Sequence, residues 1–243
     1  MPEVFRKKLG TNSVSLKVII PWTGEPQIFS SIERVKGFVT DSGFGIELVI
    51  LSGFGNREVH QLIYDEVGKD SVNTIKLDGD MCIENFDLLS EHLLQLGSDE
   101  VAIFPVYCWI LRRNVYGIHL FGKDVSGIEA GEEPFPDQYE WERTTFYPLA
   151  VQAAVSHCRT PSDDQVDNYI GHRLRKIYLS WFLRIEYIPL VIRAIVKNPS
   201  SLMRIKNILN ICVRDQYKIL VSSHEKVIGI DLIKDQFRDS IND

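Results

Sequence analysis

Apolar residues near the start of the chain fall into one short run and one longer helical stripe. Residues 16–20 form a run rich in β-branched side chains, which predicts a buried strand that ends at Pro21. The next apolar residues recur at spacings of four, three and four, at Ile28, Ile32, Val35 and Val39. This spacing is typical of one face of an amphipathic helix. The pattern therefore predicts a strand, a loop and a helix in that order.

The same alternation occurs twice more along the chain. The predicted strands are residues 46–51 and 74–77, and the helices that follow them lie at 59–67 and 86–96. A Gly-containing loop, residues 52–56, joins the first pair, and Asp78-Gly79-Asp80 joins the second. Three successive strand–helix units predict an α/β fold with a mainly parallel sheet flanked by helices. Ligands bind such sheets at the carboxyl ends of the strands.

The pattern is more mixed in the next part of the chain. Residues 101–128 are strand-like, and Arg112-Arg113-Asn114 is predicted to form a hairpin turn between two of the strands. Residues 129–137 carry acids among Pro and Gly, which predicts a loop.

The remaining elements are mostly helical. We expect a helix from Tyr139 through Leu149, a short strand at 151–155, a long helix at 163–185, and helical pieces broken near Pro189 and Pro199. The chain is therefore predicted to hold one α/β domain over residues 1–185 and a helical C-terminal extension over 186–243.

Composition places the chain among folded globular proteins. Hydrophobic residues make up 44% and charged residues 25%, so disorder and fibrous repeats are not indicated. No apolar run is long enough to cross a bilayer and the first residues lack a signal-peptide core, so we expect a cytoplasmic protein. The four cysteines form no CxxC pair, which favours reduced, mostly buried thiols over a zinc or disulfide framework.

The charge is unevenly distributed along the chain. Residues 1–171 carry 14 Lys and Arg against 26 Asp and Glu, residues 172–218 carry 10 against 2, and residues 219–243 carry 3 against 5, so the net charges are -12, +8 and -2. A basic segment on an otherwise acidic chain indicates an anionic partner surface for that segment. An anionic membrane surface, on the inner face of a membrane, is one interpretation. The other is that its apolar residues cap the core of the domain while its cations face water.

Asp78 and Asp80 stand directly after a predicted strand. Two carboxylates at this spacing can flank a divalent metal that is bound by a diphosphate, and Mn²⁺ or Mg²⁺ prefers such oxygen ligands. The alternative is a solvated turn, because this short motif is common. By position and chemistry, Asp78 and Asp80 are the candidate metal ligands.

Three segments resemble family-2-type glycosyltransferases. Residues 18–25 resemble the first strand and donor-binding loop of that family, residues 47–50 its second strand, and residues 76–80 its third strand with the metal motif. The resemblance covers about residues 16–185 and implies the nucleotide-sugar transferase fold called GT-A.

The resemblance also implies a donor site. Its contacts would come from Pro21, Trp22, Thr23 and Glu25 in the first loop, together with Asp78. The family usually has an Asp after the second strand to contact the base, whereas this chain has Ser52 and Gly53 next. Ser52 or a backbone group is then the expected hydrogen-bond partner, or the donor is not a uridine nucleotide.

A general base is expected near residue 140. Residues 139–142 resemble the acidic-aromatic segment of the family in which a carboxylate removes the proton of the acceptor hydroxyl, and Glu140 occupies that position. A carboxylate on the acceptor side suits an inverting transferase. Asp137 and Glu142 are reserve candidates. The structural alternative is an acid that is favoured at a helix start by the helix dipole.

Two further residues belong to the predicted site. His157 follows an apolar strand and resembles the late His with which the family reaches the metal or diphosphate, and neutral imidazole is a common metal ligand. Arg173, with Lys176, lies on the next predicted helix and is a candidate phosphate contact. Both cations are otherwise solvated helix residues.

Together these patterns predict a metal-dependent glycosyltransferase. It would move a sugar from a nucleoside diphosphate sugar donor to a saccharide or lipid-linked acceptor, in polysaccharide, lipid-linked sugar or glycoconjugate synthesis, and no nucleic-acid partner is expected. One alternative is a sugar nucleotidyltransferase, although the loop after the first strand lacks the basic residues typical of that class. Another is a non-catalytic binding module on a transferase fold, for which the missing base-contact Asp is the main observation.

Overall fold

The computed structural model describes residues 2–42, 45–133, 135–179 and 187–203. With these gaps, the residues form two compact units. The first consists of residues 2–107 and Asn114–His157, and the second of Cys108–Arg113 and residues 158–203. Each unit is described by itself.

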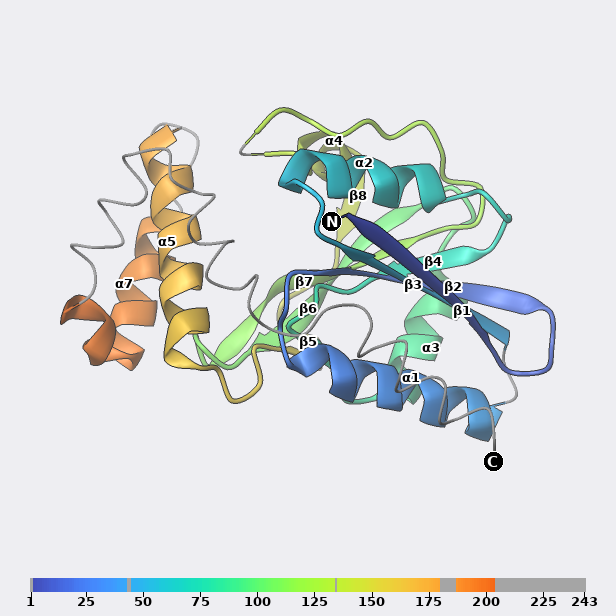
Figure 1. The fold of residues 1–243 in the computed structure, drawn as a ribbon, viewed down its shortest axis with the longest axis horizontal. Coiled ribbons are helices and arrows are strands. Elements are labelled where there is room, and N and C mark those ends of the chain that lie inside the picture. The colour runs from blue at the N-terminus through green and yellow to red at the C-terminus, as the bar shows by residue number, and fades with distance from the viewer. Residues whose placement is uncertain (1, 43–44, 134, 180–186, 204–243) are drawn as a thin grey trace. The chain divides into compact units, whose positions relative to one another are not determined.

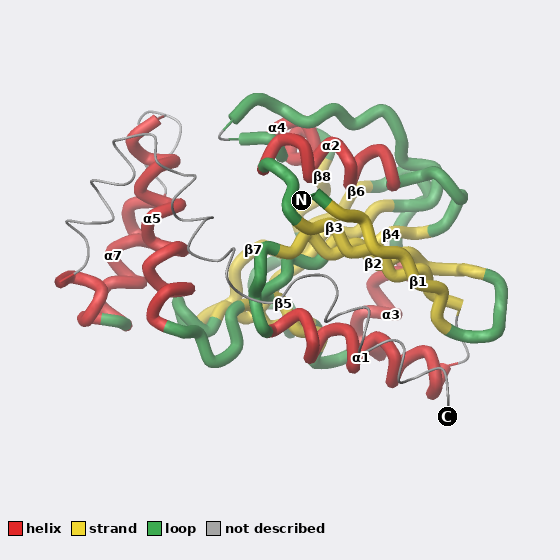
Figure 2. Tube along the Cα trace, viewed as in Figure 1, coloured by secondary structure: helices red, strands yellow, loops and turns green. Residues whose placement is uncertain are grey.

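The first unit is built on a mixed sheet with nine strands among the described residues. The strands are β1 (Glu3–Leu9), β2 (Val14–Trp22), β3 (Gly45–Ser52), β4 (Asn73–Lys76), β5 (Met81–Ile83), β6 (Val101–Cys108), β7 (Arg113–Phe121), β8 (Thr144–Phe146) and β9 (Val155–His157). Their order is β1-β3-β2-β4-β7-β6-β9-β5, with β8 beside β6. Figure 2 shows the strands in yellow as one curled, open sheet.

The parallel part of the sheet is confirmed, but the sheet as a whole is not mainly parallel. β2 runs parallel to both β3 and β4, as the three strand–helix units predict. β1 is antiparallel to β3, β7 to β4, and β9 to β5. β1 and β5 were not predicted, because β1 has few apolar residues and β5 is only three residues long.

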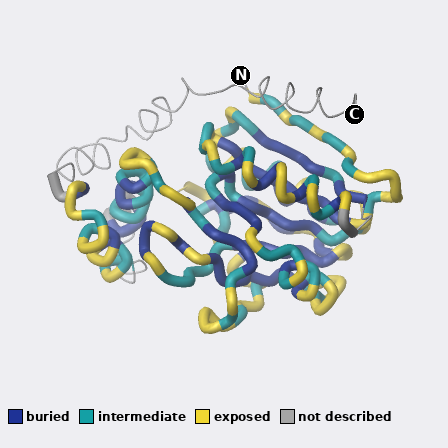
Figure 3. The backbone as a smooth tube through the Cα atoms, turned by 90° about the horizontal axis from the view of Figure 1, so that it is seen from below, coloured by how far each residue is buried: buried dark blue, intermediate teal, exposed yellow. Residues whose placement is uncertain are grey.

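Helices cover both faces of this sheet. They are α1 (Gln27–Ser42), α2 (Asn56–Glu66), α3 (Phe86–Gln95) and α4 (Gln138–Glu142). Figure 1 shows α1 and α3 on one face and α2 and α4 on the other. Alternation along β2 agrees with this arrangement, because Val18 and Ile20 pack into the core under α1, whereas Ile19 packs into the core under α2. The central strands are buried on both faces (Figure 3), as their continuous apolar runs predict.

The chain after residue 137 differs from its predicted structure. The helix expected through Leu149 ends at Glu142, because Arg143 adopts φ -104° and ψ 1° and the next residues form β8 beside β6. The β-branched Thr144 and Thr145 favour a strand at that place. The strand expected at 151–155 lies at β9 instead.

Among its described residues, the second unit contains two helices and one short turn of 3-10 helix. These are α5 (Asp163–Leu179), α7 (Tyr187–Lys197) and η1 (Pro199–Met203). Pro189 does not break α7, because it lies in the first turn, where its missing N–H would have no intrahelical partner. The end of the predicted helix 163–185 and the part of the extension beyond residue 203 lie outside the described residues. Within the described ranges, no helix has both the length and the apolar character needed to cross a membrane.

The cysteines within the described ranges agree with the predicted reduced state. Cys82, Cys108 and Cys158 are buried thiols. Cys212 lies outside the described residues.

Candidate functional site

The carboxyl ends of β2, β3 and β4 bring the predicted donor residues to one edge of the sheet. Trp22 is opposite Ser52 in the parallel register of β2 and β3, and the Leu77 N–H donates to Ile19 O at 3.0 Å, which fixes the chain just before Asp78. Residues that lie far apart in the sequence therefore meet where ligands bind parallel sheets. The donor role predicted for Trp22 and Ser52 stays a prediction.

The loop after β2 folds back onto the Asp78-Gly79-Asp80 turn. The Trp22 indole Nε1 donates to Glu25 O at 3.0 Å, and the Thr23 N–H donates to Glu25 Oε2 at 2.9 Å. A methyl group at Gly79 would lie 2.7 Å from Glu25 Oε2 and 3.1 Å from Pro21 O. Because only glycine leaves this space, the Glu25 carboxylate can rest directly on the turn between Asp78 and Asp80.

Asp80 lies beside His157, as the metal-site prediction requires. β5 pairs with β9 so that Met81 is opposite His157, which places Asp80 next to the imidazole. The distance from His157 Nε2 to Asp80 Oδ2 is 3.1 Å. Cys158 follows His157 in the chain, and one ligand atom of each of these three residues lies within 4.8 Å of the others. Asp80, His157 and Cys158 therefore form a possible metal-binding group.

The electrostatics at Asp80 favour a cation. Burial and the neighbouring Asp80 carboxylate raise the pKa of Glu25 above its usual value. Two carboxylates held close together repel each other when both are ionised, and a bound cation relieves this repulsion. Carboxylate oxygens suit Mg²⁺ and Mn²⁺, whereas imidazole and thiolate are typical ligands of softer transition metals. The carboxylate, imidazole and thiol groups gathered here fit a divalent metal as ligands, and the identity of the metal stays a prediction.

Asp78 has different neighbours from Asp80. Its Oδ1 lies 3.8 Å from the Nζ of Lys76, which is almost fully buried in β4. Burial lowers the pKa of Lys76, but the charges of Asp78, Glu140 and Asp137 outweigh this effect, and the pKa lies above its usual value. Asp78 is therefore paired with a buried ammonium on the α2 side of the sheet, and its role as a metal ligand stays a prediction.

Glu140 is fully buried, which bears on its predicted role as general base. Its Oε2 accepts the Tyr64 hydroxyl at 2.7 Å, and its Oε1 is hydrogen-bonded to His119 Nδ1. Burial raises the pKa of Glu140, but the charge and hydrogen bond of His119 and the charge of Lys76 outweigh it, so the pKa is lowered. Both carboxylate oxygens are engaged inside the protein, and the role of Glu140 as general base stays a prediction.

Asp137 is more accessible than Glu140, the other carboxylate predicted to lie on the acceptor side. It precedes α4 and is partly exposed, and its backbone carbonyl accepts the Trp141 N–H at 3.1 Å. The negative charge of Asp137 acts to raise the pKa values of Lys76 and His60. The charge of Asp78 acts on the pKa values of the same two residues in the same direction. Asp137 and Asp78 therefore share one electrostatic environment beside the end of β4.

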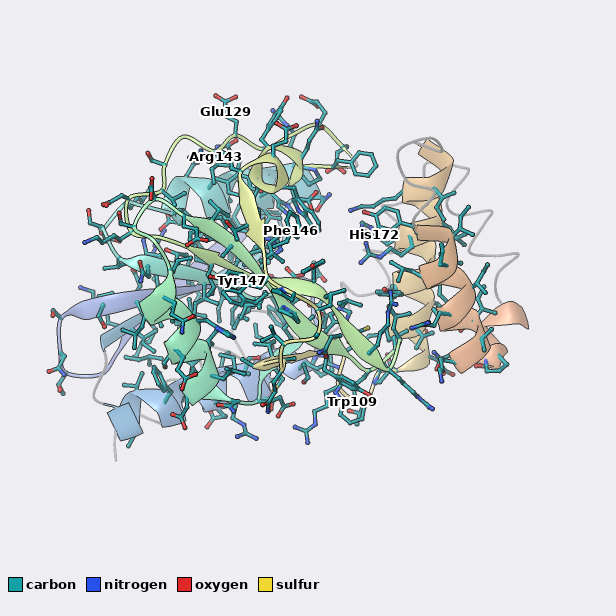
Figure 4. All side chains as sticks on the ribbon, turned by 180° about the vertical axis from the view of Figure 1, so that it is seen from behind. Trp109, Glu129, Arg143, Phe146, Tyr147 and His172 are labelled. Atoms are coloured by element: carbon teal, nitrogen blue, oxygen red, sulfur yellow. The ribbon has the colours of Figure 1, made fainter. Side chains whose placement is uncertain are left out.

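Exposed aromatic rings flank this region. The ring of Phe146 lies 5.3 Å from that of Trp141 and 5.1 Å from that of Tyr116. Trp141 and Phe146 are 38% and 40% exposed, so part of each ring faces solvent. Figure 4 marks Phe146, the last residue of β8, with Tyr147 directly after the strand and Arg143 before it.

Arg173 belongs to the second unit. Its guanidinium lies 5.1 Å from the ring centres of both Tyr169 and Tyr187, and Lys176 Nζ lies 5.9 Å from the Tyr187 ring. The phosphate contact predicted for Arg173 stays a prediction.

Four residues of this region were not singled out from the sequence, namely His60, Tyr64, Lys76 and His119. Lys76 could have been found, because a charge inside the apolar run 74–77 is unusual in a buried strand. His119 is opposite Lys76 in the antiparallel register of β4 and β7, a contact that no local pattern reveals.

Comparison with known proteins gives remote structural neighbours. No protein-family model and no curated protein matches the chain. One solved structure, described as the crystal structure of A197 from STIV, aligns at 14% identity over 58% of this chain and 83% of that chain, with a TM-score of 0.39. Another, a glycosyltransferase involved in the glycosylation of the major capsid of PBCV-1, aligns at 12% identity over 60% of this chain and 94% of that chain, with a TM-score of 0.41.

Proposed function

We propose that the chain is a metal-dependent glycosyltransferase of the GT-A type, which transfers a sugar from a nucleoside diphosphate donor to an acceptor hydroxyl with inversion. The observation that carries this proposal is the meeting of Glu25, Asp80 and His157 at the carboxyl ends of the strands, beside the first loop. A divalent cation held there supplies charge neutralisation for a departing diphosphate.

The residues of this chain supply the rest of the site. We assign the nucleotide to the first loop and Ser52, which lie side by side at the ends of β2 and β3, and Glu25 is held by Thr23 and Trp22 in one orientation. An oriented carboxylate next to Asp80 makes the site suited to a cation–diphosphate pair and unsuited to a free anion. Mn²⁺ is the first metal to test, because His157 adds a nitrogen ligand to the carboxylates.

We assign the general base to Asp137 and a positioning role to Glu140. The acceptor oxygen forms a bond to the anomeric carbon, its proton passes to Asp137, and the bond to the diphosphate breaks with the electron pair on the leaving oxygen. A base must be within reach of the proton that it takes, and Asp137 is partly exposed whereas Glu140 is enclosed. Through its hydrogen bonds to Tyr64 and His119, Glu140 holds helix α4 in position.

The acceptor is proposed to be a saccharide, free or linked to a lipid. Trp141 and Phe146 present aromatic surface to solvent close to α4. Exposed rings beside hydrogen-bonding groups offer the mixed apolar and polar surface that a sugar ring matches.

Nucleotide binding tests the proposal. We expect calorimetric titration with UDP, GDP, ADP, CDP and dTDP to show binding of at least one nucleotide that depends on Mn²⁺. Asp80→Asn should lose this binding, whereas Asp99→Asn, at an exposed acid outside the site, should keep it. Binding of none of the five nucleotides in the presence of Mn²⁺ would refute the proposal.

A further inference from the structure

Helix α7 is covered by protein on one side. It lies beside α5 within the second unit (Figure 1), and its Val191 and Ala194 side chains are buried. These two residues are three apart and so share one face of the helix. The helix is therefore anchored through this face.

The opposite side of α7 carries aliphatic and cationic residues together. Ile192 is 55% exposed and Val196 is 68% exposed, and Arg193 and Lys197 next to them are also exposed. Ile192 and Val196 are four residues apart and form one row along the helix, and Arg193 and Lys197 form a neighbouring row on the same side. We call these four residues the α7 stripe. No acidic residue occurs in α7.

This combination differs from an ordinary solvated helix face. Single exposed aliphatic residues are normal on a protein surface, but here two of them alternate with two cations on one helix. Residues 172–218, which include α7, carry 10 Lys and Arg against 2 Asp and Glu. Apolar side chains beside cations match the boundary between anionic headgroups and acyl chains.

We propose that the α7 stripe docks on an anionic lipid surface. The cations face the headgroup phosphates, and the Ile192 and Val196 side chains enter the apolar boundary beneath them. A second copy of this chain fits the stripe less well, because a two-fold contact would bring the same cations face to face. The inference is independent of the proposed sugar transfer, since it concerns another surface and another ligand.

Flotation of the full chain with vesicles tests the inference. We expect the protein to float with phosphatidylcholine vesicles that contain phosphatidylglycerol, and not with phosphatidylcholine alone. Higher salt should release it, because exposed charges are screened. Failure to float with the anionic vesicles at low salt overturns the proposal, as does a concentration-dependent dimer that Ile192→Gln and Val196→Gln abolish.

Matched variants distinguish the effect of the α7 stripe on vesicle binding from the effect of the total charge of the protein. Arg193→Gln with Lys197→Gln should lower vesicle partitioning by roughly tenfold or more, whereas Lys8→Gln with Lys123→Gln, which removes the same charge from exposed sites in the first unit, should change it much less. Ile192→Gln with Val196→Gln should lower partitioning, and Leu94→Gln, at an 84% exposed residue of α3, should not. Equal losses in the stripe and control variants overturn the proposal.

Discussion

The carboxylate of Glu66 lies almost buried among cations. Arg6 donates to its Oε2 at 2.7 Å, and Lys69 donates to its other oxygen. Burial raises its pKa, but these hydrogen bonds outweigh burial and lower the pKa from 4.5 to about 2. A depressed pKa contributes stability that is present above the unfolded value and is lost as the pH falls toward the folded value.

We therefore predict that Arg6→Gln destabilises the protein at pH 7 and that the deficit shrinks between about pH 4.5 and about pH 2. Arg6 is 43% exposed, so solvent screening keeps the effect modest. Urea unfolding of both proteins at pH 7 and pH 3 measures it, with Lys8→Gln as a control on the same strand. A deficit of equal size at both pH values would contradict this assignment.

Glu140 offers a second test at the scale of one residue. Glu140→Gln keeps the shape but removes the charge that faces His119 and Lys76, so we expect the free energy of unfolding to fall by about 1–3 kcal/mol. Tyr64→Phe, which removes one hydrogen bond to the same carboxylate, should cost less. Chemical denaturation gives both values. If Glu140→Gln abolished turnover without lowering stability, Glu140 would be the base and the assignment to Asp137 would fail.

The turn between Asp78 and Asp80 depends on the absence of a side chain at Gly79. In Gly79→Ala the new methyl group must push the Glu25 carboxylate away, so we predict weaker Mn²⁺-dependent nucleotide binding with little change in stability. Gly37→Ala is the matched control, because nothing lies within 4 Å of a methyl group at this position in α1.

The control variant has its own expected result. Alanine in a helix interior is favoured over glycine by about 0.5–1 kcal/mol, so Gly37→Ala should raise the free energy of unfolding and leave nucleotide binding unchanged. Thermal unfolding and calorimetry of both variants measure the two effects. Normal nucleotide binding by Gly79→Ala would show that Glu25 is not part of the site.

Elements with a strong local pattern could be predicted from the sequence. The strands β2 and β3 and the helix α1 have long apolar runs or stripes, and the structure forms all three. The edge strand β1 could not be predicted, because alternating half-buried and exposed residues give a weak apolar signal. The helix expected through Leu149 was wrong because pairing of β8 with β6, a long-range contact, overrides local spacing.

The candidate site was also predicted only in part, because local patterns indicate some of its residues and long-range contacts decide the others. Asp80 and His157 could be proposed because each follows an apolar strand, and the structure brings them to 3.1 Å. The enclosure of Glu140 could not be foreseen, since it depends on Tyr64 and His119, which lie 76 and 21 residues away along the chain.

At the scale of the molecule, the two units carry separate proposals. The first holds Glu25, Asp80 and His157 at its mixed sheet, and the second carries the α7 stripe. A transferase that acts on a lipid-linked acceptor gains from a surface that keeps it beside lipid. Sugar transfer and lipid docking are measured by different experiments, so either can fail without the other.

Release of nucleoside diphosphate is the most direct test of the transferase proposal. The protein would be incubated with Mn²⁺ and UDP-, GDP-, ADP-, CDP- and dTDP-sugars, with and without a mixture of oligosaccharides, and the diphosphate measured. We predict release from at least one donor, faster with a saccharide present, and lost in Asp80→Asn but kept in Asp99→Asn. No release above the Asp80→Asn background from any donor, or pyrophosphate formed from a nucleoside triphosphate and a sugar phosphate instead, would contradict it.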